Sequence, residues 1–199
     1  GNAGSGVFMG GLSGVINNTV GGTLAGAGNV IAFNGSAGVG LSTASTRNTI
    51  QGNSIFSNER RGITLDFNNF PANDLGDGDG GANNKQNFPV LTQATINNSN
   101  VTVQGTFNSA ANGTFRLEFF DSPARHSTGY GEGKNYLGFS NVSTDASGNA
   151  TFNVTLPIGG ATNHFLTATA TDANGNTSEF SLYLAPPSVT PQTVATIPY

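Results

Sequence analysis

The side chains best suited to chemistry lie together on one acidic, glycine-rich segment. Within residues 73–83, aspartates and asparagines are interspersed with glycines. Hard cations such as Ca²⁺ bind about six to eight oxygen ligands, and glycine lets a loop turn its carbonyl groups inward. The spacing is not that of an EF-hand, because the glutamate at the twelfth loop position is missing. We therefore predict a Ca²⁺ site, with a solvated acidic turn as the alternative. Its predicted ligands are Asn73, Asp74, Asp77, Asp79 and Asn83.

Other polar clusters favour structural roles over catalysis. The polar residues from Asp172 to Glu179 favour an Asx turn before a strand, with metal binding as the alternative. No Gly-x-Ser-x-Gly nucleophile elbow surrounds any serine. We therefore predict that the chain is not an enzyme. The carboxylates considered for a glycosidase, which nothing in the sequence brings together, are Glu118, Asp121 and Glu132.

The elements that would position these side chains begin with an internal repeat. Between residues 29 and 65, asparagines, glycines and aliphatic residues recur at an offset of 24. Such a period indicates a solenoid, and the apolar spacing fits strands of about three residues, not helices. We therefore predict a parallel β-helix. The recurring positions are Asn29, Ile31, Asn34, Gly38, Val39 and Leu41, matched by Asn53, Ile55, Asn58, Gly62, Ile63 and Leu65.

The repeat extends towards the beginning of the chain. Residues 6–9 match residues 38–41, and residues 18–22 match residues 48–52 at an offset of 30. Roughly two and a half to three coils are present, close to the minimum for a stable solenoid. The pattern starts without a polar cap or signal peptide, so we expect a processed or truncated product with an open coil end. The asparagine pairs predicted to stack are Asn18/Asn48, Asn29/Asn53 and Asn34/Asn58.

From residue 100 onwards, apolar residues alternate with polar residues at period two. Turn clusters separate six or seven such segments, and this pattern predicts a β-sandwich of immunoglobulin type. The expected fold class is therefore all-β. The expected divisions are β-helix coils at 1–70, an acidic loop and capping linker at 71–95, the sandwich at 96–185 and a Pro/Thr-rich tail at 186–199.

The composition excludes several classes of function. Only 9% of the 199 residues are charged, and the net charge is −4, so the clustered basic residues that bind nucleic acid are lacking. No apolar run approaches the length of about 18 residues needed to span a membrane. The sequence has no cysteine, so it has no disulfide framework. We predict a secreted or cell-surface protein.

An open coil end and an apolar tail together predict self-association. Val194, Ile197 and Tyr199 could add an edge strand to another surface, while Val7 and Phe8 lie at the open end. The leading hypothesis is a structural subunit that assembles head to tail, with copies of itself as partners, into a filament. The alternative is a Ca²⁺-dependent polysaccharide-binding or adhesion module of a larger cell-surface protein. For that alternative, the aromatic residues that could stack on a sugar, or else pack in the core, are Tyr130, Tyr136 and Phe139.

Several motifs follow one another in a recognisable order. They are residues 62–66 (GITLD), 73–84, 86–91 (QNFPVL), 115–120 (FRLEFF), 129–133 (GYGEG) and 167–180. In this order they resemble the C-terminal portion of secreted bacterial proteins with right-handed parallel β-helix repeats, including those that carry a CSLREA domain. The resemblance covers residues 1 to about 185. It implies a right-handed β-helix followed by an immunoglobulin-like module in an extracellular setting, and it implies no particular activity.

Overall fold

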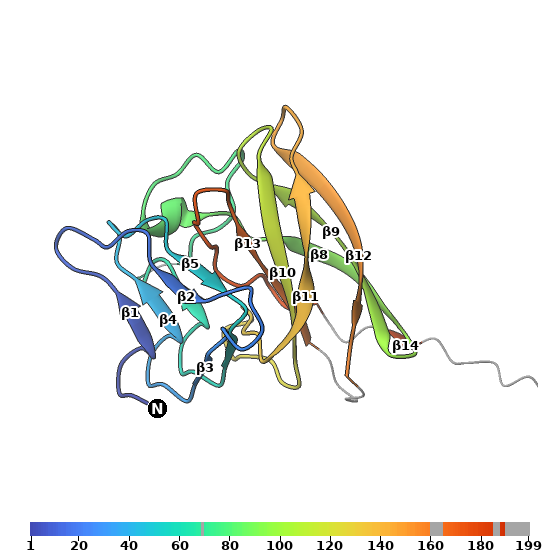
Figure 1. Ribbon diagram of the computed structural model, residues 1–199, viewed down its shortest axis with the longest axis horizontal. Helices are drawn as coiled ribbons and strands as arrows, with labels where there is room; N and C mark the ends of the chain where they lie inside the picture. The colour runs from blue at the N-terminus through green and yellow to red at the C-terminus, as the bar shows by residue number, and fades with distance from the viewer. Residues whose placement is uncertain (69, 160–164, 185–187, 190–199) are drawn as a thin grey trace, which may run out of the picture.

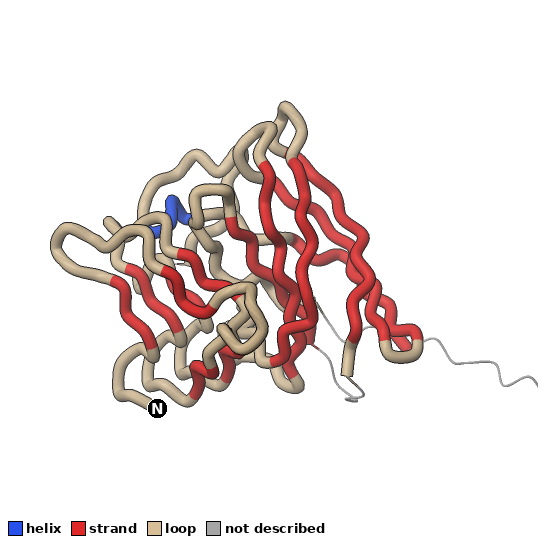
Figure 2. Tube along the Cα trace, viewed as in Figure 1, coloured by secondary structure: helices blue, strands red, loops and turns tan. Residues whose placement is uncertain are grey.

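The computed structural model describes residues 1–68, 70–159, 165–184 and 188–189. The described chain is all-β, and its one short helical segment is a 3-10 turn at Ala82–Lys85. Figure 1 and Figure 2 show short strands on one side of the molecule and longer, packed strands on the other. Within the described residues, no helix is long and apolar enough to cross a membrane.

The short strands form three parallel ladders in residues 1–66, which we call the coil region. Ile31 pairs with Ile55 and Val39 with Ile63, so the predicted offset of 24 is confirmed. Val20 pairs with Ile50, which confirms the offset of 30. The ladders are β1-β4-β7, β2-β5 and β3-β6. Their strands are β1 Val7–Met9, β2 Thr19–Gly21, β3 Val30–Ala32, β4 Val39–Leu41, β5 Thr49–Gln51, β6 Ser54–Phe56 and β7 Ile63–Thr64.

Stacked asparagines hold the turns of the coil region together. In each predicted pair, the side-chain Nδ2 of the earlier residue donates to Oδ1 of the later one, over 2.8 to 3.1 Å. The backbone N–H of the earlier residue donates to the same oxygen. One amide oxygen thus accepts two hydrogen bonds across the stack, which explains why asparagine is required there.

The longer strands form two sheets that pack face to face in residues 90–184, which we call the sandwich region. Their orders are β11-β10-β13 and β12-β9-β8-β14. The strand β8 begins at Val90, so the segment predicted as a linker up to residue 95 already belongs to a sheet. The bounds are β8 Val90–Asn97, β9 Asn100–Asn108, β10 Thr114–Ser122, β11 Asn135–Ser143, β12 Asn149–Pro157, β13 Phe165–Thr171 and β14 Ser188–Val189.

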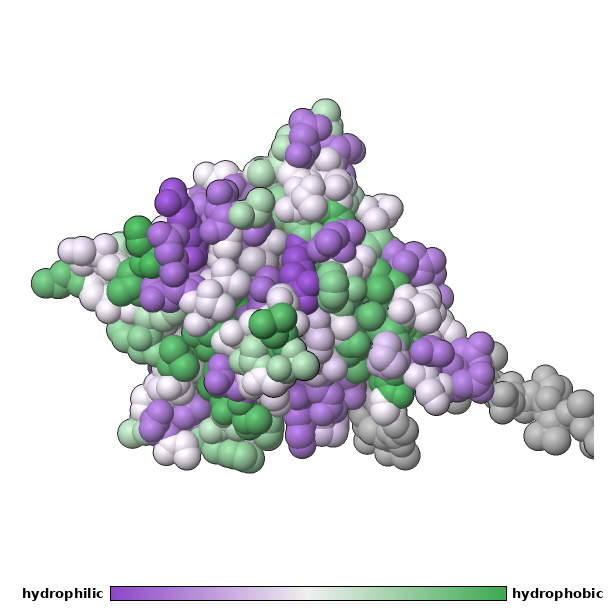
Figure 3. Space-filling view, viewed as in Figure 1, coloured by the Kyte–Doolittle hydropathy of each residue, from purple (hydrophilic) through white to green (hydrophobic). Residues whose placement is uncertain are grey.

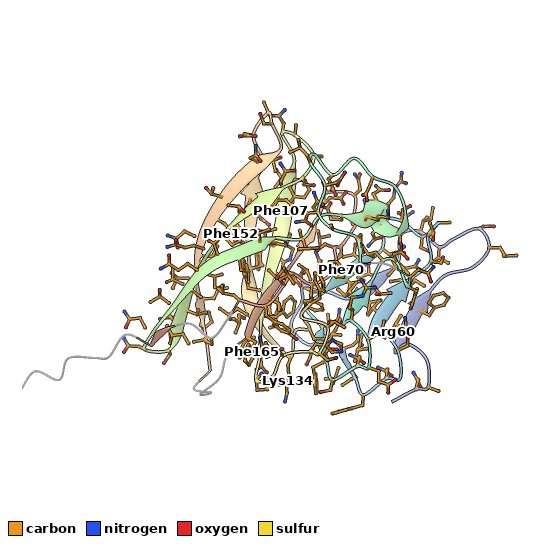
Figure 4. The ribbon with its side chains drawn as sticks, turned by 180° about the vertical axis from the view of Figure 1, so that it is seen from behind. Arg60, Phe70, Phe107, Lys134, Phe152 and Phe165 are labelled. Carbon is orange, nitrogen blue, oxygen red and sulfur yellow. The ribbon has the colours of Figure 1, made fainter. Side chains whose placement is uncertain are left out.

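In the sheet β11-β10-β13, most residues of β10 and β13 are buried on both faces. Leu117 and Phe119 of β10 point into the core between the two sheets, together with Phe107 and Phe152, which Figure 4 labels within the sandwich region. The alternate residue Phe120 joins the apolar core of the coil region. Polar residues on the same face are also buried, notably Thr167, Thr169 and Thr171. The two regions therefore have separate apolar cores, and this face of the sheet packs against the core of the coil region.

Candidate functional site

The predicted acidic cluster forms in the loop between the coil region and β8. One carboxylate oxygen from each of Asp74, Asp77 and Asp79 lies within 4.8 Å of the others. Ligands bound to one Ca²⁺ at about 2.3–2.6 Å can lie at most about 5.2 Å apart. The three aspartates therefore have a spacing that a single cation could bridge.

A buried asparagine, Asn87, which was not among the predicted site residues, holds this loop in place. Asn87 Oδ1 accepts from the Asp74 backbone N–H over 3.1 Å, and its Nδ2 donates to the Asp74 carbonyl over 2.7 Å. Its own backbone N–H donates to Asp77 Oδ1 over 2.9 Å. Ser109 Oγ donates to the other Asp77 oxygen over 2.7 Å. Asp77 is therefore fixed by bonds to both of its oxygens.

Two oxygens of the cluster have no partner. Asp74 Oδ1 and Asp79 Oδ1 are buried and accept no hydrogen bond. The second oxygen of Asp74 accepts from the Gly78 backbone N–H, and that of Asp79 lies 3.3 Å from Lys85 Nζ. A buried carboxylate oxygen without a donor is costly unless a cation contacts it.

The pKa of Asp77 is raised, as expected for a buried carboxyl close to two other carboxylates. Burial raises the pKa of this carboxyl to about 6, and the charges of Asp74 and Asp79 add to the increase. The hydrogen bonds from Ser109 and Asn87 oppose it. A bound cation would favour the charged form and lower this pKa.

The structure corrects two of the predicted ligands. Asn73 uses both ends of its side-chain amide on Phe88, accepting from its N–H over 3.0 Å and donating to its carbonyl over 2.8 Å. Asn83 is fully buried, and its Oδ1 accepts from the Asn48 backbone N–H over 3.0 Å. Asn83 is thus the next member of the stack formed by Asn18 and Asn48, and it belongs to the coil region, not to the acidic cluster.

Three buried glutamates of the sandwich region close the far end of the coil region. Glu118 Oε2 accepts from the Gly52 backbone N–H over 2.9 Å, and Glu179 Oε1 accepts from the Leu65 backbone N–H over 2.7 Å. Glu132 accepts from two successive backbone N–H groups beyond β6. Glu118 and Glu132, two of the carboxylates considered for a glycosidase, accept hydrogen bonds from the residues that follow β5 and β6.

Further acceptors complete this closure. Asn176 Oδ1 accepts from the Arg47 backbone N–H over 2.7 Å, and Thr177 Oγ1 accepts from the Ile50 backbone N–H over 2.9 Å. Asp172 Oδ1 accepts from the backbone N–H groups of Asn174 and Asn176, so the predicted Asx turn is confirmed. This closure could not be predicted, because its donors and acceptors lie far apart along the chain.

Aromatic residues near the junction pack against the interior. Tyr130 stacks on Phe70, with ring centroids 3.2 Å apart, and Figure 4 labels Phe70 between the two regions. Tyr136 packs edge-on against Phe120. Arg116 lies 3.6 Å from the centroid of the Phe139 ring. These contacts favour the packing interpretation for Tyr130, whereas Tyr136 and Phe139 are 41% and 49% exposed, so both interpretations still apply to these two residues.

The opposite end of the coil region is open. The edges of β1, β2 and β3 surround a hollow of about 440 Å³, whose lining includes Val7, Val20 and Val30. Phe8 is 59% exposed and contacts Phe67, with ring centroids 5.9 Å apart. Figure 3 shows hydrophobic residues gathered over this side of the molecule. The other predicted self-association residues, Val194, Ile197 and Tyr199, lie outside the described residues.

Comparisons with known proteins do not identify a family. No protein-family model matches the sequence, and a comparison with curated proteins finds no significant match. The resemblance to secreted β-helix repeat proteins therefore stays a prediction.

Proposed function

We propose that this chain is a non-enzymatic, extracellular structural subunit that assembles head to tail with copies of itself. In this proposal residues 1–70 form a short right-handed parallel β-helix. Residues 96–185 form an immunoglobulin-like β-sandwich that closes one end of the helix. The secreted or cell-surface setting rests on the composition, which is poor in charge and rich in Asn, Thr and Gly, and on the resemblance to secreted β-helix repeat proteins.

The observation that carries this proposal is the difference between the two ends of the coil region. At one end, side chains such as Glu118 and Glu179 accept hydrogen bonds from the last strands. At the other end, β1, β2 and β3 each pair on one side only among the described residues, and Val30 is 75% exposed. Unpaired strand edges beside apolar side chains favour the addition of further strands.

This asymmetry determines the kind of assembly. The closed end and the open end present different surfaces. If the open ends of two copies met each other, both open ends would be used up and assembly would stop at a dimer. A contact between the open end of one copy and a different surface of the next propagates as a filament. The predicted edge strand of the tail, which includes Val194, Ile197 and Tyr199, is the proposed second surface.

Sedimentation velocity and electron microscopy of the purified chain test this proposal. We expect concentration-dependent oligomers, and Val30→Glu should suppress them because it places a charge in the hollow. The matched control is Leu75→Glu, which changes another exposed aliphatic residue, 86% exposed, in the acidic loop. A chain that stays monomeric with its coil region folded, as judged by amide hydrogen exchange, would refute the proposal.

A second candidate function is a Ca²⁺-dependent polysaccharide-binding or adhesion module. It is favoured by the two unpartnered carboxylate oxygens, Asp74 Oδ1 and Asp79 Oδ1, in a cluster of three aspartates. Here Asp74, Asp77 and Asp79 would hold the ion, and backbone carbonyls or water would supply the remaining ligands. The ion would fix the loop beside Asn108, whose side chain accepts from the Gly76 backbone N–H over 2.8 Å.

Thermal unfolding with Ca²⁺ or a chelator tests this second candidate. At a Ca²⁺ concentration 100 times the Kd, binding contributes about 2.7 kcal/mol of stability, or a rise in Tm of about 5–11 °C at this chain length. Asp79→Asn should abolish the rise, whereas Glu59→Gln, which removes an exposed carboxylate elsewhere, should preserve it. Binding of neutral glycans on an array should disappear with the chelator. An equal Tm with Ca²⁺ and with chelator would exclude this candidate.

A further inference from the structure

A second pocket lies on the outer side of the junction, away from the acidic cluster. Its volume is about 290 Å³, at the lower limit for ligand pockets, which suits a single sugar ring. One wall comes from the turns after β3 and β6, and the other comes from the segment between β10 and β11. Figure 4 labels Lys134 at this edge of the junction. The lining residues used below are Phe33, Phe56, Arg125, His126, Glu132 and Lys134.

An exposed phenylalanine forms the apolar wall. Phe33 is 67% exposed and contacts Phe56 edge to face, with ring centroids 5.6 Å apart. Its backbone has a positive φ of 60°, and Ser57, at the matching position of the next coil, has a φ of 54°. The turn therefore accounts for the backbone conformation but not for the large aromatic side chain, because serine serves the same turn. Phe33 presents its ring to solvent at the mouth of the pocket.

Two basic residues without ion pairs among the described residues, Arg125 and Lys134, line this pocket. Lys134 Nζ lies 4.9 Å from the centroid of the Phe56 ring, and the Arg125 guanidinium lies 5.7 Å from that of Phe165. Within the described part of the chain, neither residue forms a salt bridge, whereas Arg61, Arg116 and Lys85 each do. The chain has only seven basic residues and a net charge of −4, so the presence of both Lys134 and Arg125 at one pocket is a local concentration of positive charge.

The pocket also contains one carboxylate, Glu132, which lowers its formal charge by one but forms no ion pair with Arg125 or Lys134. Both oxygens of Glu132 already accept hydrogen bonds from Ser57 and Asn58. His126 Nε2 lies 2.9 Å from the Asn58 carbonyl, so it donates there, while Nδ1 bonds with Thr128 Oγ1. Arg125 and Lys134 therefore remain free to contact an anion.

We propose that this pocket binds one carboxylated sugar ring, such as a uronic acid. The apolar face of the ring would lie against Phe33, and its carboxylate would lie between Lys134 and Arg125. A neutral sugar would use only the aromatic wall, and a small carboxylate would use only the cations. The inference goes beyond the second candidate function, because this pocket does not include the acidic cluster and the binding proposed here needs no Ca²⁺.

NMR titration of the chain with D-glucuronate tests the proposal. The comparison ligands are D-glucose, which lacks the carboxylate, and acetate, which lacks the ring. All titrations contain a chelator, so that a failure of the Ca²⁺ proposal leaves this one intact. We expect glucuronate to bind at least about tenfold more tightly than either comparison ligand, since a hydrogen bond to a charged group is worth about that factor. If the natural ligand is a uronic acid within a glycan, methyl glucuronide should bind as tightly as free glucuronate. If the natural ligand is the free acid, methyl glucuronide should bind more weakly.

Variants separate this pocket from non-specific binding. Lys134→Met and Phe33→Ala should each weaken glucuronate binding about tenfold. Arg47→Met, which removes another exposed basic side chain outside the pocket, should leave the affinity unchanged. Equal affinities for glucuronate and glucose, or an equal effect of Arg47→Met and Lys134→Met, would overturn the proposal. So would chemical-shift changes confined to residues outside the pocket.

Discussion

Replacing Glu132 with alanine removes the acceptor that covers the turn after β6. Its Oε1 accepts from the Asn58 backbone N–H over 3.0 Å and from Asn58 Nδ2 over 2.9 Å, and its Oε2 accepts from the Ser57 backbone N–H over 2.7 Å. Without the carboxylate, the buried backbone N–H of Asn58 has no acceptor among the described residues. Asn58 Nδ2 keeps the carbonyls of Ile31 and Phe56.

The magnitude follows from these three donors. Leaving the Asn58 N–H unsatisfied costs about 1–3 kcal/mol. Ser57 is exposed, so water can replace its bond, and the net loss there is about 0.5–1.5 kcal/mol. We expect Glu132→Ala to lower the free energy of unfolding by about 2–4 kcal/mol. Glu132→Gln should cost less, because its carbonyl oxygen can still accept from Asn58.

Urea denaturation followed by far-UV circular dichroism measures the loss, and hydrogen exchange locates it. The Asn58 amide should exchange much faster in Glu132→Ala. Glu59→Ala, which removes an exposed glutamate from the neighbouring position, is the matched control. If the free energies of unfolding of the two variants lie within about 0.5 kcal/mol of each other, Glu132 does not stabilise the turn after β6 as proposed.

Two further predictions concern the same closed end. Burial raises the pKa of Glu179 from 4.5 to about 7, despite the opposing charge of Arg61, so the folded state binds this proton more tightly than the unfolded state. The free energy of unfolding should therefore fall as the pH rises from about 4.5 to 7, by at most about 1.4 kcal/mol per pH unit, and Glu179→Gln should flatten this slope in urea denaturation at pH 5, 6 and 7. An unchanged slope would contradict the assignment. Asn83→Ala should lower stability by about 2–4 kcal/mol, because Asn83 serves the buried N–H of Asn48. The control is Asn112→Ala, because Asn112 has a positive φ as Asn83 does but lies on an exposed turn. If both variants lose similar stability, the effect comes from the backbone conformation alone.

The sequence predicted the parts of the fold that repeat. Asn34 and Asn58 are recognisable because aliphatic residues and glycines recur around them at the same offset. The stacking of Asn83 on Asn48 was not predicted, because Asn83 follows Asn48 by 35 residues and no matching strand residues accompany it. The acidic cluster was predictable because its three aspartates are close along the chain, whereas the role of Asn87 depends on a bond to Asn108 in another element.

The junction between the two regions could not be predicted from one sequence. Alternation along β13 indicates a strand with one polar face, and Thr167 and Thr169 look like residues that face solvent. In the structure that face is buried against the coil region, where its hydroxyl groups are enclosed. Periodicity distinguishes the two faces of a strand, but it does not reveal that a second layer covers the polar one.

The three glutamates that close the coil region, Glu118, Glu132 and Glu179, come late in the sequence. The coil region therefore cannot be completed until they have been made. A ribosome completes residues 1–66 before it makes any of the three capping glutamates. The hydrogen bonds from Gly52 to Glu118 and from Leu65 to Glu179 span 66 and 114 residues. Closing such long loops costs chain entropy before the contacts form. A growing chain therefore carries its first strands as an unfinished, aggregation-prone intermediate until Glu179 has been synthesised.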